Sequence, residues 1–179
     1  MSGAGNEDQE KWTYSVRVIP NVVLRAQFRN TLTYRLHPRL TTGIEFNPRA
    51  AEPGDRVNPL VNWVAMTETA QRPALIIGTS SDRIGTPRGQ SFYATFSKNL
   101  KRETGLPLAP YVGVSYGTYE HRWLPLAGLN VNFTRNLSST VIYDGVRVHP
   151  LVNYAWGRHA LSFVLAFANK PGFSYSISF

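Results

Sequence analysis

Apolar and polar residues alternate along most of this chain, and the first alternating run is the longest. From residue 12 to residue 36 nearly every even position is apolar, while most odd positions carry arginine, threonine, serine or glutamine. A period of two residues is typical of β-strands, whose successive side chains point to opposite faces. The run is too long for one strand, so it predicts two strands with a tight turn at Pro20 and Asn21 or at Arg29 and Asn30.

The alternation recurs to the end of the chain, and no convincing helical period interrupts it. Further strands are expected in residues 42–46, 57–65, 74–79, 92–97, 112–117, 129–134, 137–143, 146–154, 161–167 and 172–179. Asp144 and Gly145 are a strong signal for a two-residue hairpin turn. The sequence therefore predicts an all-β fold, a closed antiparallel up-and-down barrel of about twelve strands, or ten if one short hairpin is misassigned. This single barrel domain is expected over residues 11–179, after a disordered segment at residues 1–10.

Two parts of the chain resemble each other. Residues 56–63 and 147–154 are identical at six of eight positions. Two shorter matches follow in the same order, residues 72–75 with 158–161 and residues 89–96 with 172–179. The matches favour a duplicated six-strand unit. The alternative is that barrel hairpins converge on a similar composition.

The final strand has one apolar face and one face of small residues. Its apolar residues alternate with glycine and serine up to the aromatic Phe179. This tail resembles the C-terminal assembly signal of Gram-negative outer-membrane β-barrel proteins. The residues that carry the resemblance are Gly172, Phe173, Tyr175, Ile177 and Phe179. It implies a transmembrane barrel in the cell outer membrane, with lipid and lipopolysaccharide around it and the barrel-assembly machinery as a partner.

Composition leaves this interpretation open. The chain has 179 residues and a mean hydropathy of −0.23, and no apolar run approaches the roughly 18 residues of a membrane helix. A barrel strand needs only about 9 to 11 alternating residues. There is no cysteine. Residues 1–10 lack the basic start and apolar stretch of a secretory signal, so the signal has been removed from this sequence, the assigned start is wrong, or the barrel is soluble.

Charge points to anionic partners. The net charge is +8, and arginine supplies most of the positive charge. The arginines are dispersed singly and accompany no nucleic-acid motif, so nucleic acid is not expected as a partner. The alternation along each expected strand places most of the polar and charged residues on one face of the sheet. These are Arg17, Arg25, Arg29, Arg35, Glu45, Asn58, Asn62, Glu68, Arg147, His149 and Asn153.

Two functions fit that face if it lines the inside of the barrel. One is a small passive channel in which arginines favour anionic solutes. The other is a structural barrel whose interior is filled by hydrogen-bonded polar side chains. Residues 80–89, with Asp82, Arg83 and Arg88, form a polar loop that either folds inward as a constriction or ligand site or stays a solvated surface loop. Arg83 and Arg88, with Arg49 and Arg122, are also candidates for contacts with lipopolysaccharide phosphates.

Aromatic residues fall mainly near the expected strand ends, as in the interfacial girdles of membrane barrels. They are Trp12, Tyr14, Trp63, Tyr111, Tyr119, Trp123, Tyr143, Tyr154 and Trp156. A period of two does not say which face is concave. In the inverted arrangement the apolar face would fill the core of a soluble barrel that binds an apolar ligand.

A third alternative is an outer-membrane enzyme that modifies lipids. Glu120 with His121, His149 near Asp144, and Ser80 or Ser81 with Asp82 are the candidate groups. None has the spacing of a nucleophile elbow or a metal site, so we expect no enzyme activity, no metal and no cofactor.

Overall fold

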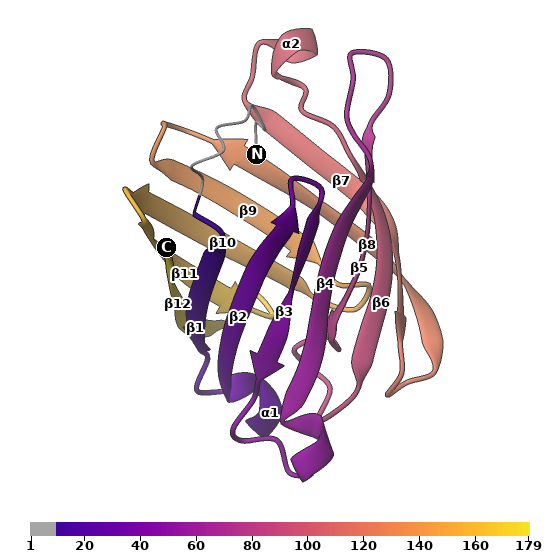
Figure 1. The fold of residues 1–179 in the computed structure, drawn as a ribbon, viewed down its shortest axis with the longest axis vertical. Helices are drawn as coiled ribbons and strands as arrows, with labels where there is room; N and C mark the ends of the chain where they lie inside the picture. Colours follow the sequence, from indigo (N-terminus) through magenta and orange to yellow (C-terminus); the bar gives the residue numbers. More distant parts are fainter. Residues whose placement is uncertain (1–9) are drawn as a thin grey trace.

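The computed structural model describes residues 10–179, which form a closed barrel of twelve antiparallel strands (Figure 1). Each strand pairs with its neighbours in the sequence, and β1 pairs with β12 to close the sheet. The predicted all-β, up-and-down barrel is therefore confirmed, with twelve strands rather than ten. The strands are β1 Trp12–Val18, β2 Phe28–His37, β3 Leu40–Phe46, β4 Val57–Met66, β5 Ala74–Ser81, β6 Gln90–Ser97, β7 Leu108–Gly117, β8 Arg122–Asn132, β9 Leu137–Tyr143, β10 Val148–Trp156, β11 His159–Ala166 and β12 Lys170–Ser178.

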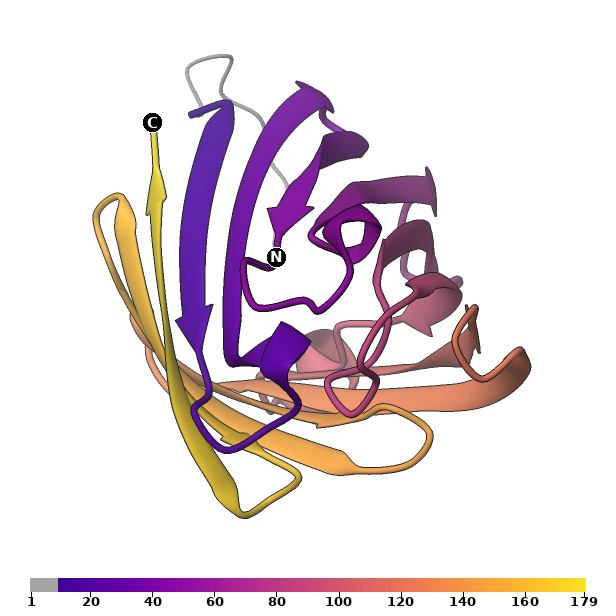
Figure 2. The same ribbon diagram turned by 90° about the horizontal axis from the view of Figure 1, so that it is seen from below.

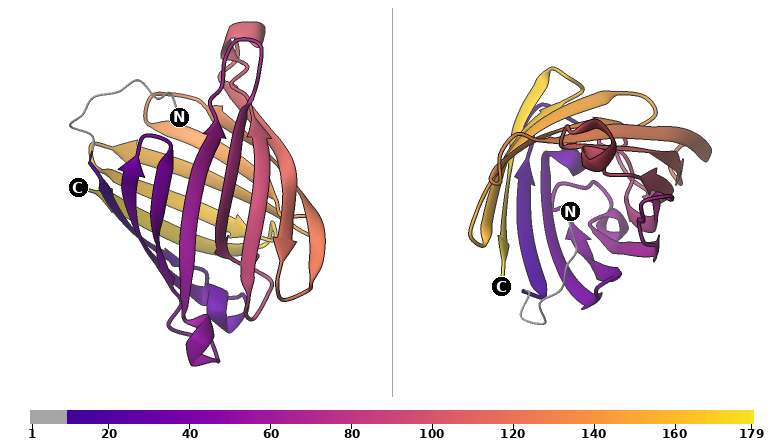
Figure 3. Two further views of the ribbon diagram at one scale, coloured as in Figure 1. Left: turned by 45° about the vertical axis from the view of Figure 1, so that its right-hand side comes forward. Right: turned by 90° about the horizontal axis from the view of Figure 1, so that it is seen from above.

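Because the number of strands is even, the first strand begins and the last strand ends at the same end of the barrel. We call the end at which β1 begins and β12 ends the terminal end, and the opposite one the distal end. The distal end carries α1 (Leu24–Gln27) and η1 (Pro53–Asp55), and Figure 2 looks onto it. The terminal end carries α2 (Lys101–Thr104), at the top of the left view in Figure 3.

The first alternating run folds differently from the prediction at one point. A turn does lie at Pro20 and Asn21, but β2 begins only at Phe28, and α1 occupies part of the connection. The backbone N–H of Ile19 donates to Gln27 O at 2.9 Å and closes this connection. Alternation across residues 22–27 thus suggested a strand where there is a turn of helix. Arg25 consequently lies on α1 at the distal end, and its assignment to a strand was wrong.

The two faces of the sheet differ sharply in chemistry. Among residues 10–179, 29 large apolar side chains are exposed, whereas only seven apolar residues are buried. The buried set is rich in polar and charged groups instead. Glu45 is 0% exposed, and Arg25 and His149 are each 3% exposed. The apolar face is therefore the outer surface of the barrel, and the polar face lines its interior, which we call the lumen.

The two matching parts of the sequence occupy equivalent places. The matches fall on β4, β5 and β6 and on β10, β11 and β12, six strands further around the barrel. Asn58 and His149, which correspond in the first match, are both buried. Duplication of a six-strand unit stays a prediction.

Residues 1–9 lie outside the described residues, so the predicted disorder of residues 1–10 is not addressed by the structure. Within residues 10–179, no helix has the length and apolar character needed to cross a membrane.

Candidate functional site in the lumen

A group of charged side chains lies in the lumen near the distal end. Arg17 on β1 and Arg29 on β2 are direct partners in the strand pairing and share the inward face. Arg29 forms an ion pair with Glu45 on β3. The second carboxylate oxygen of Glu45 accepts the backbone N–H of Ser81 at 3.1 Å. A carboxylate shut off from solvent is costly unless it is paired, so Arg29 and Ser81 are what make Glu45 tolerable there.

Arg25 fixes a loop across the distal end of the lumen. Its Nη2 donates to Asp82 O and Arg83 O, each at 2.8 Å, and its Nε donates to Thr86 O at 3.0 Å. Thr86 is completely buried. We call residues 82–89, which connect β5 to β6, the Arg25-anchored loop. These bonds join it to α1 and turn it inward.

Carboxylates hold the rest of this loop. Asp82 accepts the backbone N–H of Arg83 at 2.7 Å and that of Tyr119 at 3.3 Å. Arg83 forms an ion pair with Glu120 in the β7–β8 connection, and Arg122 contacts the same carboxylate at 3.0 Å. The hydrogen bond from Arg83 is the main reason that the pKa of Glu120 lies below its ordinary value of 4.5.

His149 and Asp144 form a second buried pair beside the loop. His149 Nε2 lies 3.0 Å from Asp144 Oδ2, and His149 Nδ1 accepts the backbone N–H of Phe167 at 3.3 Å. Burial alone would raise the pKa of Asp144, but hydrogen bonds from His149, Arg147 and Val146 outweigh burial and hold this pKa below 3.8. Both ring nitrogens of His149 are occupied. It therefore has no free nitrogen with which to activate a serine.

A small cavity of about 150 Å³ lies between the Arg25-anchored loop and the barrel wall. Seven of its ten lining residues carry a hydroxyl or carboxylate group, although apolar atoms form more of the lining surface than polar atoms do, and it is large enough for several water molecules. The lining residues are Ser80, Ser81, Asp82, Arg83, Ser91, Tyr93, Ser115, Leu124, Leu126 and Asp144.

Several buried polar atoms have no hydrogen-bond partner among the described residues. They are Arg17 Nε, Asn47 Nδ2, Asn47 Oδ1, Asn62 Oδ1 and Gln90 Oε1. Such atoms cost free energy unless water or a ligand satisfies them. The lumen is therefore polar, and some of its polar side-chain atoms have no hydrogen-bond partner among the described residues.

The structure separates the predicted lumen residues into two groups. Inward and at least partly buried are Arg17, Arg29, Glu45, Asn58, Asn62, His149 and Asn153. Arg35 is exposed near the end of β2, and Arg147 is exposed in the β9–β10 turn. Glu68 is exposed in the β4–β5 connection, where it accepts the backbone N–H of Asn99 at 3.1 Å. The alternation assigns a residue to one face of the sheet but does not say whether the residue lies within a strand or beyond its end. For this reason Arg147 and Glu68 were predicted to line the lumen, although both lie in connections between strands.

The residues predicted for the polar loop and for the C-terminal assembly signal differ in their exposure. Asp82 is buried, Arg83 is half-buried, and Arg88 is exposed with its guanidinium 5.9 Å from the Tyr119 ring. Phe173 and Tyr175 on β12 and Phe179 directly after it are exposed on the outer surface, and Ile177 on β12 is half-buried. Gly172 is buried, and a Cβ there would come within 2.5 Å of Val18 O, so the close approach of β1 requires glycine.

The aromatic residues of the outer surface gather near both ends of the strands. At the terminal end, the rings of Trp156 and His159 stack with their centroids 5.6 Å apart, and those of His159 and Tyr175 stack with their centroids 6.0 Å apart. At the distal end, the ring centroids of Tyr116 and Trp123 lie 5.4 Å apart. Tyr111 is an exception to the predicted girdle: it pairs with the inward-facing Gly128, whose Cβ would meet its ring at 2.4 Å.

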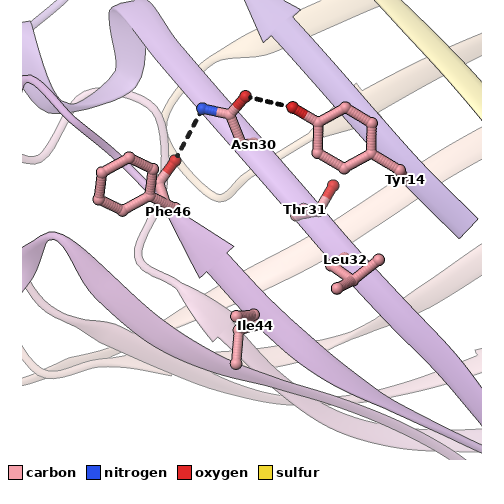
Figure 4. A pocket seen from close by; sticks show the side chains of 6 residues that line it. All are labelled: Tyr14, Asn30, Thr31, Leu32, Ile44 and Phe46. Atoms are coloured by element: carbon pink, nitrogen blue, oxygen red, sulfur yellow. Dashed lines mark hydrogen bonds between the residues drawn. The ribbon is translucent and has the colours of Figure 1, made fainter.

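A surface groove of about 380 Å³ crosses β1, β2 and β3 (Figure 4). Its side chains are Tyr14, Asn30, Thr31, Leu32, Ile44 and Phe46. Tyr14 donates its hydroxyl to Asn30 Oδ1 at 2.9 Å, and Asn30 Nδ2 donates to Phe46 O at 3.4 Å. The Asn30 amide is thus satisfied at both ends in otherwise apolar surroundings.

Sequence reasoning missed three features of the distal end. Ile19, Val164 and Ala166 form a small apolar core inside the barrel, and Ile84 of the Arg25-anchored loop packs against it. Asn47 and Thr86 are almost fully buried. The position of Asn47, two residues beyond the inward-facing Glu45, is the one signal that pointed to the lumen.

No protein-family model and no curated protein matches the chain. Within residues 10–179, no group of three or more His, Asp or Glu residues is arranged to hold a metal ion. Function is therefore inferred from the barrel itself.

Proposed function

We propose that this chain is a β-barrel of a Gram-negative outer membrane, with a basic, polar lumen that favours small anionic solutes. The observation that carries the proposal is the distribution of polarity. Large apolar side chains cover the outer surface while Glu45, Arg25 and His149 are buried inside. A water-soluble barrel needs the opposite arrangement, because apolar burial drives its folding.

Backbone hydrogen bonding supports the same proposal. In a bilayer each backbone N–H and C=O group must find its partner within the protein, and a closed barrel achieves this without a free edge. Pairing of β1 with β12 removes the two edges that the open sheet would have. The aromatic residues near the strand ends suit the two membrane interfaces, with aliphatic residues such as Val112 and Val114 of β7 between them.

The charges of the lumen support a preference for anions. Arg17, Arg25 and Arg29 lie near its distal end, and of these three described arginines only Arg29 forms an ion pair, with Glu45. Arginines lining a narrow water-filled passage favour anions over cations. The Arg25-anchored loop narrows the distal end, so we expect the wild-type conductance to be small.

A position in the outer membrane also implies which molecules contact the barrel. Exposed Arg49, Arg88 and Arg122 lie at the distal end, where they would meet lipopolysaccharide phosphates. The outward residues Phe173, Tyr175 and Phe179 of β12 and the segment after it would be recognised by the barrel-assembly machinery. No catalytic role is proposed, since His149 has both ring nitrogens bonded.

The experiment is refolding followed by recording of ionic current. The chain is refolded with and without detergent, inserted into planar bilayers, and its reversal potential is measured in a potassium chloride gradient. We expect folding only with detergent and small, anion-selective current steps. Folding to a stable monomer in plain buffer would refute the membrane assignment, and cation selectivity would refute the basic lumen.

The R25M variant distinguishes a narrowed channel from a plugged structural barrel. Loss of the Arg25 guanidinium removes the bonds to the Arg25-anchored loop, so the variant should conduct more than the wild type. R88M is the matched control, because Arg88 is an exposed arginine of the same loop. If neither the wild type nor R25M conducts, the passive channel is refuted and a structural barrel is left.

A further inference from the structure

We infer that Arg17 and Asn47 form a binding site for a small oxyanion, such as inorganic phosphate, sulfate or a carboxylate, in the lumen. The site rests on the proposed function in one respect, that the lumen is filled with water. It goes beyond a general preference for anions by naming where the anion binds and which groups hold it.

The strand pairing places the groups of the site in one row. Arg17 on β1 is opposite Arg29 on β2 and, on its other side, opposite Ser174 on β12. Asn30 pairs with Phe46, so Asn47 stands next in register to Arg29. Neighbouring strands lie about 4.8 Å apart. The row Ser174, Arg17, Arg29 and Asn47 therefore presents a hydroxyl, two guanidinium groups and an amide to one stretch of the lumen.

The charges in this row are unbalanced. Arg29 has Glu45 as its ion-pair partner, and both oxygens of Glu45 are already engaged, one by Arg29 and the other by the backbone N–H of Ser81. Arg25 is surrounded by the carbonyl groups of the loop. Arg17 has neither a carboxylate nor a carbonyl partner among the described residues, and it faces a second arginine directly. Like charges directly opposite one another on a sheet are destabilising.

Two residues of this row, Arg17 and Asn47, carry side-chain atoms without a partner among the described residues. Arg17 Nε is buried without a hydrogen bond, and both side-chain atoms of Asn47 are buried without one. Asn47 is only 1% exposed, so its amide is not an ordinary solvated group. An oxyanion would accept from Arg17 and from Asn47 Nδ2 and would neutralise the excess cation. Arginine is well suited to this because its planar fork matches phosphate and carboxylate oxygens.

Direct binding to the detergent-folded barrel tests the inference. The protein is purified in a chloride buffer, and inorganic phosphate, sulfate or acetate is titrated by isothermal calorimetry at constant ionic strength. We expect saturable binding of one oxyanion per barrel, and the three probes separate tetrahedral anions from carboxylates. In R17Q the affinity should fall about tenfold or more, as expected when a charged hydrogen bond is lost. R88Q, which alters an exposed arginine, should bind as the wild type does.

Two stability measurements guard against a variant that merely misfolds. Removing the like charge opposite Arg29 should leave the unfolding temperature of R17Q in chloride equal to or above that of the wild type, while phosphate no longer raises it. N47D should bind no added oxyanion, because it supplies a carboxylate of its own. Absence of binding to the wild type, or equal binding to R17Q, overturns the inference.

The outcome is separable from that of the proposed function. A barrel that requires detergent but binds none of the three anions refutes this site and leaves the membrane assignment standing. A barrel that folds in plain buffer and binds phosphate through Arg17 refutes the membrane assignment and supports this site.

Discussion

Arg25 Nη2 lies 2.8 Å from both Asp82 O and Arg83 O, so one side chain on α1 holds the loop that follows β5. The contact joins residues far apart in the sequence at the distal end. Arg25, which is 3% exposed, therefore fixes this part of the Arg25-anchored loop, and Asp82 and the Arg83–Glu120 ion pair hold the rest.

The R25A substitution should destabilise the barrel by about 2–4 kcal/mol, because hydrogen bonds from a charged group are worth about 1.5–3 kcal/mol each and water replaces only part of them. Urea titration of the barrel in detergent measures the change. R88A is the control and should stay within about 0.5 kcal/mol of the wild type. Equal stability of R25A and R88A would mean that the loop does not depend on Arg25.

The E45Q substitution should cost about 3–5 kcal/mol, since it removes the charged partner of Arg29 inside the lumen. The double variant R29M/E45M should be less destabilised than E45Q, because it leaves no unpaired charge. The two free energies of unfolding come from the same urea titration. If the double variant is the less stable of the two, the pair is not the reason for the cost.

Acid should loosen the distal end. The pKa values of Glu120 and Asp144 lie below their ordinary values of 4.5 and 3.8, so each carboxylate stabilises the fold at pH values above those. This stabilisation is lost as the pH falls through the lower folded-state pKa values. Unfolding free energies of the wild type and of E120Q/D144N, measured from pH 6 to pH 3, should show a steeper loss for the wild type. A wild type that gains stability on acidification would contradict the sign.

An outward charge provides a test of the environment of the sheet. Val112 on β7 is 60% exposed on the outer surface, and V112R should cost about 2–4 kcal/mol if that surface lies in the bilayer. The matched variant R88V changes an exposed loop position and should have little effect. Both are measured by urea unfolding in lipid vesicles. A cost for V112R below about 0.5 kcal/mol is the value for an ordinary water-exposed surface and would contradict the membrane assignment.

Alternation in the sequence predicted the strands well because inward and outward side chains must differ in polarity wherever the two sides of a sheet meet different surroundings. It left open which face is concave, since a period of two is symmetric under exchange of the faces. The buried Glu45 and the exposed Val112 settle that point in the structure.

The remainder of the site depended on tertiary contacts that no local pattern encodes. Residues around Arg25 continue the alternation, yet they form α1, from which the Arg25 guanidinium binds the Arg25-anchored loop. Thr86 looked like an ordinary turn residue and is completely buried. Glu68 has the parity of a lumen residue but lies beyond the end of β4.

The most direct test of the central claim uses the four tryptophans, Trp12, Trp63, Trp123 and Trp156, all of which are exposed on the outer surface. The barrel is reconstituted into vesicles of lipids with or without brominated acyl chains, and tryptophan fluorescence is compared with quenching by aqueous acrylamide. The account predicts strong quenching by brominated lipid and weak quenching by acrylamide. Strong quenching by acrylamide with none by brominated lipid would place the apolar surface in water and contradict the account.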